Sequence, residues 1–121
     1  SQSSGIFTFP KTGIYLVQLH MLIFLNNSTT KSQRCGANIQ TTTDNANYVG
    51  AATGDVHFGG GGYGTNIDTS ATASCAAMFD ITDTSNHKVR FVFGAGQGHE
   101  KVAGNSSNNR TFATFTLIGD T

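Results

Sequence analysis

The stretch Ile14–Leu25, IYLVQLHMLIFL, decides the class of fold. Its odd positions all carry apolar side chains: Tyr15, Val17, Leu19, Met21, Ile23 and Leu25. Alternation with a period of two is typical of a β-strand. The even positions are also apolar, apart from two polar residues in the middle: Ile14, Leu16, Gln18, His20, Leu22 and Phe24. A strand with two apolar faces is covered on both sides. We therefore expect one face to pack on an opposite sheet and the other on a neighbouring subunit.

Shorter segments with the same alternation follow along the chain, and no stretch keeps a helical period with caps. Turns that are polar or rich in glycine separate these segments, such as the loop that contains Gly59–Gly62. Residues 94–109 are expected to form one long loop. Further strands are expected at residues 5–9, 33–40, 48–56, 71–82, 89–93 and 110–118. About seven or eight short strands separated by turns predict an all-β sandwich or barrel.

Charge divides the expected strands into two groups. Strands near residues 14–25, 73–81 and 111–118 lack charge on their outer faces, whereas those near 32–40 and 87–93 carry lysine and arginine there. This division predicts two sheets, one facing solvent and one buried in an oligomer.

The composition fits one domain spanning residues 1–121, which is long enough to bury a core. Seven basic residues balance seven acidic ones, and only 12% of residues are charged, so the chain is a poor binder of nucleic acid or anionic membranes. The apolar stretch Ile14–Leu25 is too short to span a bilayer, which argues against membrane insertion. Because the chain starts at Ser1 rather than Met, we expect a trimmed fragment or the C-terminal head of a longer chain.

Two cysteines, Cys35 and Cys75, allow one bridge or none. Both lie in alternating apolar segments, where buried free thiols are common. A disulfide would require an oxidising compartment. The sequence leaves both alternatives open.

The start of the chain carries a specific motif. Gly5–Tyr15, GIFTFPKTGIY, resembles the pattern G-x-F-T-x-P-x-x-G-x-Y that leads into a long apolar strand in complement C1q-like domains of the C1q/tumour-necrosis-factor superfamily. Val89–Phe93 is similar to the penultimate strand of that family, and Phe112–Ile118 to its closing F-x-G-F-x-L strand, with Ala113 in place of the glycine. The resemblance covers nearly the whole chain in strand order, and only its first motif is specific.

The resemblance implies a two-sheet antiparallel jelly roll of ten strands that forms a compact homotrimer around its inner sheet. In that family, about thirty residues with a first strand precede the motif, whereas only Ser1–Ser4 precede it here. Either the chain is trimmed, or this is a shortened version, or a partner supplies that edge. The expected trimer interface consists of outward-facing residues on the uncharged strands: Ile14, Leu16, Gln18, His20, Leu22, Phe24, Ala76, Met78, Phe112 and Thr114.

No residue pattern indicates catalysis, so we expect no enzymatic activity. The four histidines lack the spacing of metal sites, and the sequence contains no G-x-S-x-G nucleophile motif. No cofactor is expected, apart from a structural calcium ion as an open alternative. Asp44, Asp55 and Asp68 lie on expected loops, although they form no contiguous calcium-binding motif.

Aromatic and histidine side chains in or beside the polar loops suggest a recognition surface. Such side chains on loops that a rigid sandwich holds are suited to ligand binding. Glycans in particular bind through aromatic stacking and neutral hydrogen bonds. The alternative is that Phe58 and Tyr63 only anchor their loops to the core. The candidate ligand-binding residues are Tyr48, His57, Phe58, Tyr63 and His99.

These expectations combine into a non-enzymatic trimeric head that binds a glycan or protein receptor on a cell surface. The bias toward Gly, Asn, Thr and Ser with low charge suggests a viral or phage fibre tip or virion surface. One alternative is a secreted cellular C1q-like adhesion or recognition domain, which would be extracellular. A purely structural virion decoration subunit without a ligand is another, and a small jelly-roll hydrolase is the fourth.

Overall fold

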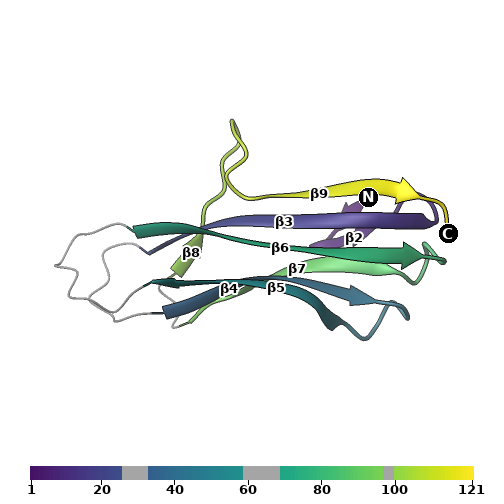
Figure 1. The fold of residues 1–121 in the computed structure, drawn as a ribbon, viewed down its shortest axis with the longest axis horizontal. Helices are drawn as coiled ribbons and strands as arrows, with labels where there is room; N and C mark the ends of the chain where they lie inside the picture. The colour runs from purple at the N-terminus through teal and green to yellow at the C-terminus, as the bar shows by residue number, and fades with distance from the viewer. Residues whose placement is uncertain (26–32, 59–68, 97–99) are drawn as a thin grey trace.

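A computed structural model describes residues 1–25, 33–58, 69–96 and 100–121, which form two stacked layers of β-strands (Figure 1). The described residues contain nine strands and no helix. The strands are β1 (Gln2–Ser3), β2 (Ile6–Thr8), β3 (Gly13–Leu25), β4 (Gln33–Thr42), β5 (Val49–Phe58), β6 (Thr69–Ile81), β7 (Lys88–Gly94), β8 (Glu100–Val102) and β9 (Phe112–Gly119).

All strand pairs are antiparallel, and they form two sheets. The five-stranded sheet has the order β1-β2-β7-β4-β5. In the four-stranded sheet, β3 is central: β6 pairs with one edge along its whole length, while β9 and β8 share the other edge. The three strands expected to lack outward charge therefore lie in one sheet, and β4 and β7 lie in the other. The predicted division of strands between two sheets is confirmed.

Two short strands, β1 and β8, were not predicted from the sequence. Residues 94–109 were expected to be a loop, but β8 lies within them and pairs with the end of β3, Val102 opposite Ile23. The two-residue β1 pairs with β2 and forms the edge of the five-stranded sheet. Elements of two or three residues are too short to show a period, so alternation alone cannot reveal them.

The odd-numbered side chains of β3 form the centre of the core. Val17 and Ile23 are completely buried, and Tyr15 and Leu19 are 3% and 2% exposed. Full burial of a large apolar side chain contributes about 1.5–3 kcal/mol relative to exposure. The other sheet supplies Cys35, Ala37, Ile39 and Val89 to the same core. The expected inward face of the long strand is confirmed.

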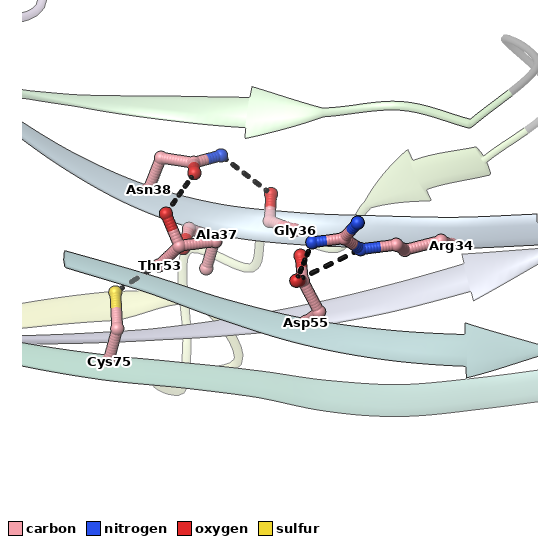
Figure 2. A network of polar contacts seen from close by, with 7 residues as sticks. All are labelled: Arg34, Gly36, Ala37, Asn38, Thr53, Asp55 and Cys75. Atoms are coloured by element: carbon pink, nitrogen blue, oxygen red, sulfur yellow. Dashed lines mark hydrogen bonds and ion pairs between the residues drawn. The ribbon is translucent and has the colours of Figure 1, made fainter. Parts of the chain in front are cut away.

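Small residues bring the two sheets together along β5 and β6. A Cβ atom built on Gly54 would lie 2.0 Å from the backbone oxygen of Ser74 on β6. Nearby, the Cys75 thiol donates a hydrogen bond across the sandwich to the Ala37 carbonyl at 3.3 Å (Figure 2). On the opposite side, aromatic rings fill the space between β2, β7 and β9: the Phe7 ring centroid lies 5.0 Å from that of Phe91 and 5.6 Å from that of Phe115.

Two turns of the same design sit side by side, and a backbone bond from Asn45 N to Asn86 O joins them. In each, an aspartate Oδ1 accepts two backbone N–H bonds and Oδ2 accepts the amide of an asparagine three residues later. Asp44 pairs in this way with Asn47, and Asp83 with Asn86. Hydrogen bonds to the charged form lower the pKa of both carboxyls below the usual value. In both turns, the aspartate carboxylate holds the backbone in place by accepting hydrogen bonds from the N–H groups that follow it.

Both cysteines are free thiols, which answers the question that the sequence left open. Cys35 is buried, and Cys75 is half-buried beneath β5. Burial raises the pKa of both thiols.

Replacing Gly54 with alanine should destabilise the fold, because its Cβ would collide with rigid backbone rather than with a movable side chain. Overpacking of this kind costs about 1–3 kcal/mol. Gly50→Ala, on the same strand, meets nothing within 4 Å and is the matched control, with a change of about 0.5 kcal/mol or less. Urea denaturation of both variants measures the difference. Equal midpoints would contradict the close approach of β5 and β6.

The two aspartate turns should make the fold sensitive to acid. Because the pKa values of Asp44 and Asp83 are lowered by folding, their contribution is complete above the unfolded value of about 4 and is lost as the pH falls below it. When the melting temperature is measured from about pH 7 down to about pH 2, it should therefore decrease once the pH is lower than about 4. The fall should be smaller in the double variant Asp44→Asn, Asp83→Asn, which starts from a lower melting temperature; an unchanged acid dependence would contradict this assignment.

Candidate functional site

The residues expected at a subunit interface lie together on the outer surface of the four-stranded sheet. Even-numbered residues of β3 point away from the core, since the odd-numbered ones fill it. Strand register aligns their neighbours on both sides. We call this surface the β3 face; its expected members are Ile14, Leu16, Gln18, His20, Leu22 and Phe24 on β3, Ala76 and Met78 on β6, and Phe112 and Thr114 on β9.

The β3 face exposes an unusual amount of apolar surface. Met78 is 68% exposed, and Phe112 is 36% exposed. The even-numbered side chains of β3 are only half-buried. Ile118 of β9 is 52% exposed and shares the outward side of its strand with Phe112, although it was absent from the expected interface set. Single exposed apolar residues are common, but a contiguous apolar patch marks an interaction site.

Charge is confined to the two ends of this face. Asp80 on β6 is opposite Ile14, and Lys101 on β8 is opposite Phe24. Strand β9 contains no charged residue. The expectation of an outer surface without charge therefore holds for its centre and fails at its ends.

The polar centre of the β3 face is satisfied within the subunit. His20 Nδ1 lies 2.9 Å from Ser74 Oγ of β6, and the imidazole stacks on the Phe112 ring of β9 with centroids 4.8 Å apart and planes at 24°. Next to it, Thr114 Oγ1 donates to Gln18 Oε1 at 3.4 Å. These contacts fix the orientation of His20, and they leave its Nε2 atom as the nitrogen not engaged by Ser74.

A groove of about 260 Å³ opens between the two sheets beside β9 and was not foreseen. Phe115 and Leu117 point toward the core, as expected, yet remain 37% and 38% exposed. The reason is that short strands β1 and β2 form the facing edge and leave β9 incompletely covered. Alternation predicts the direction of a side chain but not the length of the strand opposite. The groove is lined by Phe7, Leu19, Met21, Phe91, Thr111, Phe112, Ala113 and Phe115.

The candidate ligand-binding residues are not gathered at one place. Tyr48 is half-buried, with the Arg90 guanidinium carbon 4.2 Å from its ring centroid. Arg90 Nε also donates to Gln40 Oε1 at 2.7 Å, which fixes the guanidinium over the ring. His57 is exposed near the other end of β5. Nine residues of strand separate Tyr48 from His57 by about 30 Å.

Phe58 requires a correction. Its side chain is 4% exposed and belongs to the core, so it anchors the end of β5 rather than contacting a ligand. A single apolar residue at a strand end looks the same in sequence whether it points inward or outward. Tyr63 and His99 lie outside the described residues.

Polar side chains on the outer surface of the five-stranded sheet bond to one another (Figure 2). Arg34 binds Asp55 through Nε and Nη2, which raises the pKa of the guanidinium. Asn38 donates to the carbonyls of Gly36 and Val92 and accepts a bond from Thr53 Oγ1 at 2.8 Å. A Cβ on Gly36 would lie 2.6 Å from Asp55 Oδ1, so glycine makes room for the ion pair.

The calcium alternative receives no support from the described residues. The carboxylate of Asp44 is occupied by its own turn, and Asp55 binds Arg34. Asp68 lies outside the described residues. Among those that are described, no three His, Cys, Asp or Glu side chains are grouped to hold a metal ion.

The surroundings of the two thiols disfavour a role as a nucleophile. A nucleophilic cysteine needs a lowered pKa, whereas burial raises the pKa of Cys35 and Cys75. Glu100, 6% exposed at the start of β8, is near Cys35 and raises the pKa of that thiol further. No pattern in the sequence indicates that this glutamate is buried, because it lies in a segment rich in glycine and polar residues.

Within the described parts of the chain, no helix is long and apolar enough to cross a membrane. No family model and no curated protein matches this chain.

Proposed function

We propose that this chain is a non-enzymatic recognition head that forms a homotrimer through the β3 face and binds a glycan or protein receptor on a cell surface. The observation that carries the proposal is the apolar β3 face, with charge only at its ends. Because Met78 and Ile118 are 68% and 52% exposed, covering what remains of each side chain contributes about 1–2 kcal/mol. The outer surface of the other sheet carries Arg34, Asp55, Lys88 and Arg90 and suits solvent.

The order of strands supports a jelly roll. The chain passes from the five-stranded sheet at β2 to the other sheet at β3, returns at β4, and crosses again after β5, β6 and β7. Repeated crossing between two antiparallel sheets is characteristic of Greek-key and jelly-roll folds. Together with the motif Gly5–Tyr15, this connectivity supports membership of the C1q-like group, and that resemblance is what implies three copies.

Recognition is assigned to the side of the molecule that assembly leaves free. Tyr48 with its stacked Arg90, and the exposed His57, lie on the five-stranded sheet or at its ends, away from the β3 face. Planar rings and a fixed guanidinium suit the apolar faces and hydroxyl groups of a sugar. The placement on a virion surface or outside a cell rests on composition alone, and a structural decoration subunit without a ligand is one outcome of the binding test.

Leu22→Arg should dissociate the assembly, because it places a charge in the middle of the β3 face. Light scattering should give a trimer mass for the wild type and a monomer mass for the variant. Val92→Arg is the matched control: Val92 is a half-buried aliphatic residue that faces outward on the central strand of the other sheet. Assembly should survive this change. A monomeric wild type, or dissociation by both variants alike, would contradict the proposed interface.

Ligand binding should depend on His57. A glycan array identifies the sugar class that the wild-type head binds, and His57→Ala should then weaken binding to that sugar by about tenfold, or about 1.4 kcal/mol. Since His57 is exposed, the fold should tolerate the change. His87→Ala, in the turn before β7, is the control. Silence of the array, and of a screen against cell-surface proteins, would favour the purely structural role.

A further inference from the structure

We propose that His20 makes self-association through the β3 face dependent on pH, so that copies separate in mild acid. This inference rests on the proposed function, because it concerns the same surface. It goes beyond that function by assigning one side chain that would release the assembly under mildly acidic conditions.

His20 occupies the centre of the β3 face. It lies midway along β3, with Ser74 of β6 opposite on one side and Phe112 of β9 opposite on the other. Its hydrogen bond to Ser74 and its stack on Phe112 hold the ring in the plane of contact with another copy. A symmetric assembly would therefore bury one such ring from every copy.

The separate subunit can accept a proton on His20 without losing these contacts. The Ser74 hydroxyl serves as donor or acceptor, so it can bond to Nδ1 in either protonation state. The Phe112 stack is made within the subunit, so it is present both before and after association. Because neither contact changes on association, neither makes association depend on pH. Such a dependence must come from the removal of water from the His20 ring.

Among the described residues of this face, no negative charge lies close to His20. On β6, the nearest ionisable group of this face is Asp80, six strand positions or about 20 Å along β3. On β8, it is Lys101, four positions or about 13 Å away and positive. Strand β9 has none, and the exposed Arg110 that precedes it is also positive. The surroundings of His20 on the face are Gln18, Leu22, Ala76 and Thr114.

Association would therefore favour the neutral ring. Burying an uncompensated charge is unfavourable, and charged rings from two or three copies would also repel one another. The assembled state then binds protons less readily than the free subunit. A histidine whose charged form is disfavoured by association stabilises the assembly fully at pH values above the pKa of that histidine in the free subunit. This stabilisation is lost as the pH falls.

The first experiment is sedimentation of the wild type and His20→Gln at about pH 8 and about pH 5.5, on either side of the imidazole transition. The wild type should associate several-fold more weakly at the lower pH, because one pKa unit of difference weakens association by at most about tenfold for each histidine. Glutamine keeps a polar side chain but does not titrate, so His20→Gln should show no such loss. His87→Gln, in a turn outside the face, should behave like the wild type.

A titration by nuclear magnetic resonance covers the case in which His20→Gln fails to assemble. The ring-proton midpoint of His20 should be lower in the assembled wild type than in monomeric Leu22→Arg. Equal midpoints overturn the inference, as do pH-independent association of the wild type and an equal loss in His20→Gln; in each case the proposed function stands. A wild type that is monomeric at about pH 8 overturns both proposals.

Discussion

Strand β3 has apolar side chains on both faces and partners on both edges, and the rest of the molecule is arranged to cover it. Its odd-numbered residues need a second sheet above them, and β4 and β7 supply that sheet. Its backbone needs hydrogen-bonding partners along thirteen residues, which β6 provides in full and β9 with β8 provide on the other side. Its even-numbered face is left only half-buried by the described parts of the chain. The same strand thus defines both the core and the surface that remains to be covered.

The outer surfaces of the two sheets differ in chemistry. The five-stranded sheet pairs its polar groups with one another, as Asn38 with Thr53 and Arg34 with Asp55 show (Figure 2). Such a surface is stable in contact with water, since its polar groups are already hydrogen-bonded to one another. The β3 face mixes exposed apolar side chains such as Met78 and Phe112 with exposed hydroxyl side chains such as Thr72 and Thr116, and its centre is uncharged. This contrast is the physical basis for assigning assembly to one side and recognition to the other.

Alternation in the sequence was sufficient to place the long strand and its inward residues, and the distribution of charge was sufficient to divide the strands between the sheets. The ten residues expected at the interface share one face because residue parity and antiparallel register determine it. Three kinds of feature lay beyond such reasoning. The short strands β1 and β8 are set by pairing with longer neighbours, and Phe58 is buried by the sheet opposite. The exposure of Phe115 depends on how far β2 extends, which no residue in β9 encodes.

The register of β3 also determines when the molecule can fold during its synthesis. Its first partner, β6, begins at Thr69, and β9, which completes the sheet, ends at Gly119, near the last residue. A nascent chain that has emerged only as far as β5 holds a thirteen-residue apolar strand with neither edge paired. Contacts between such distant segments form slowly, because the chain loses the entropy of closing the long loop before the contacts contribute any stabilisation. The central strand therefore stays unpaired until β6 has emerged from the ribosome, and until then chaperones have an exposed strand to bind.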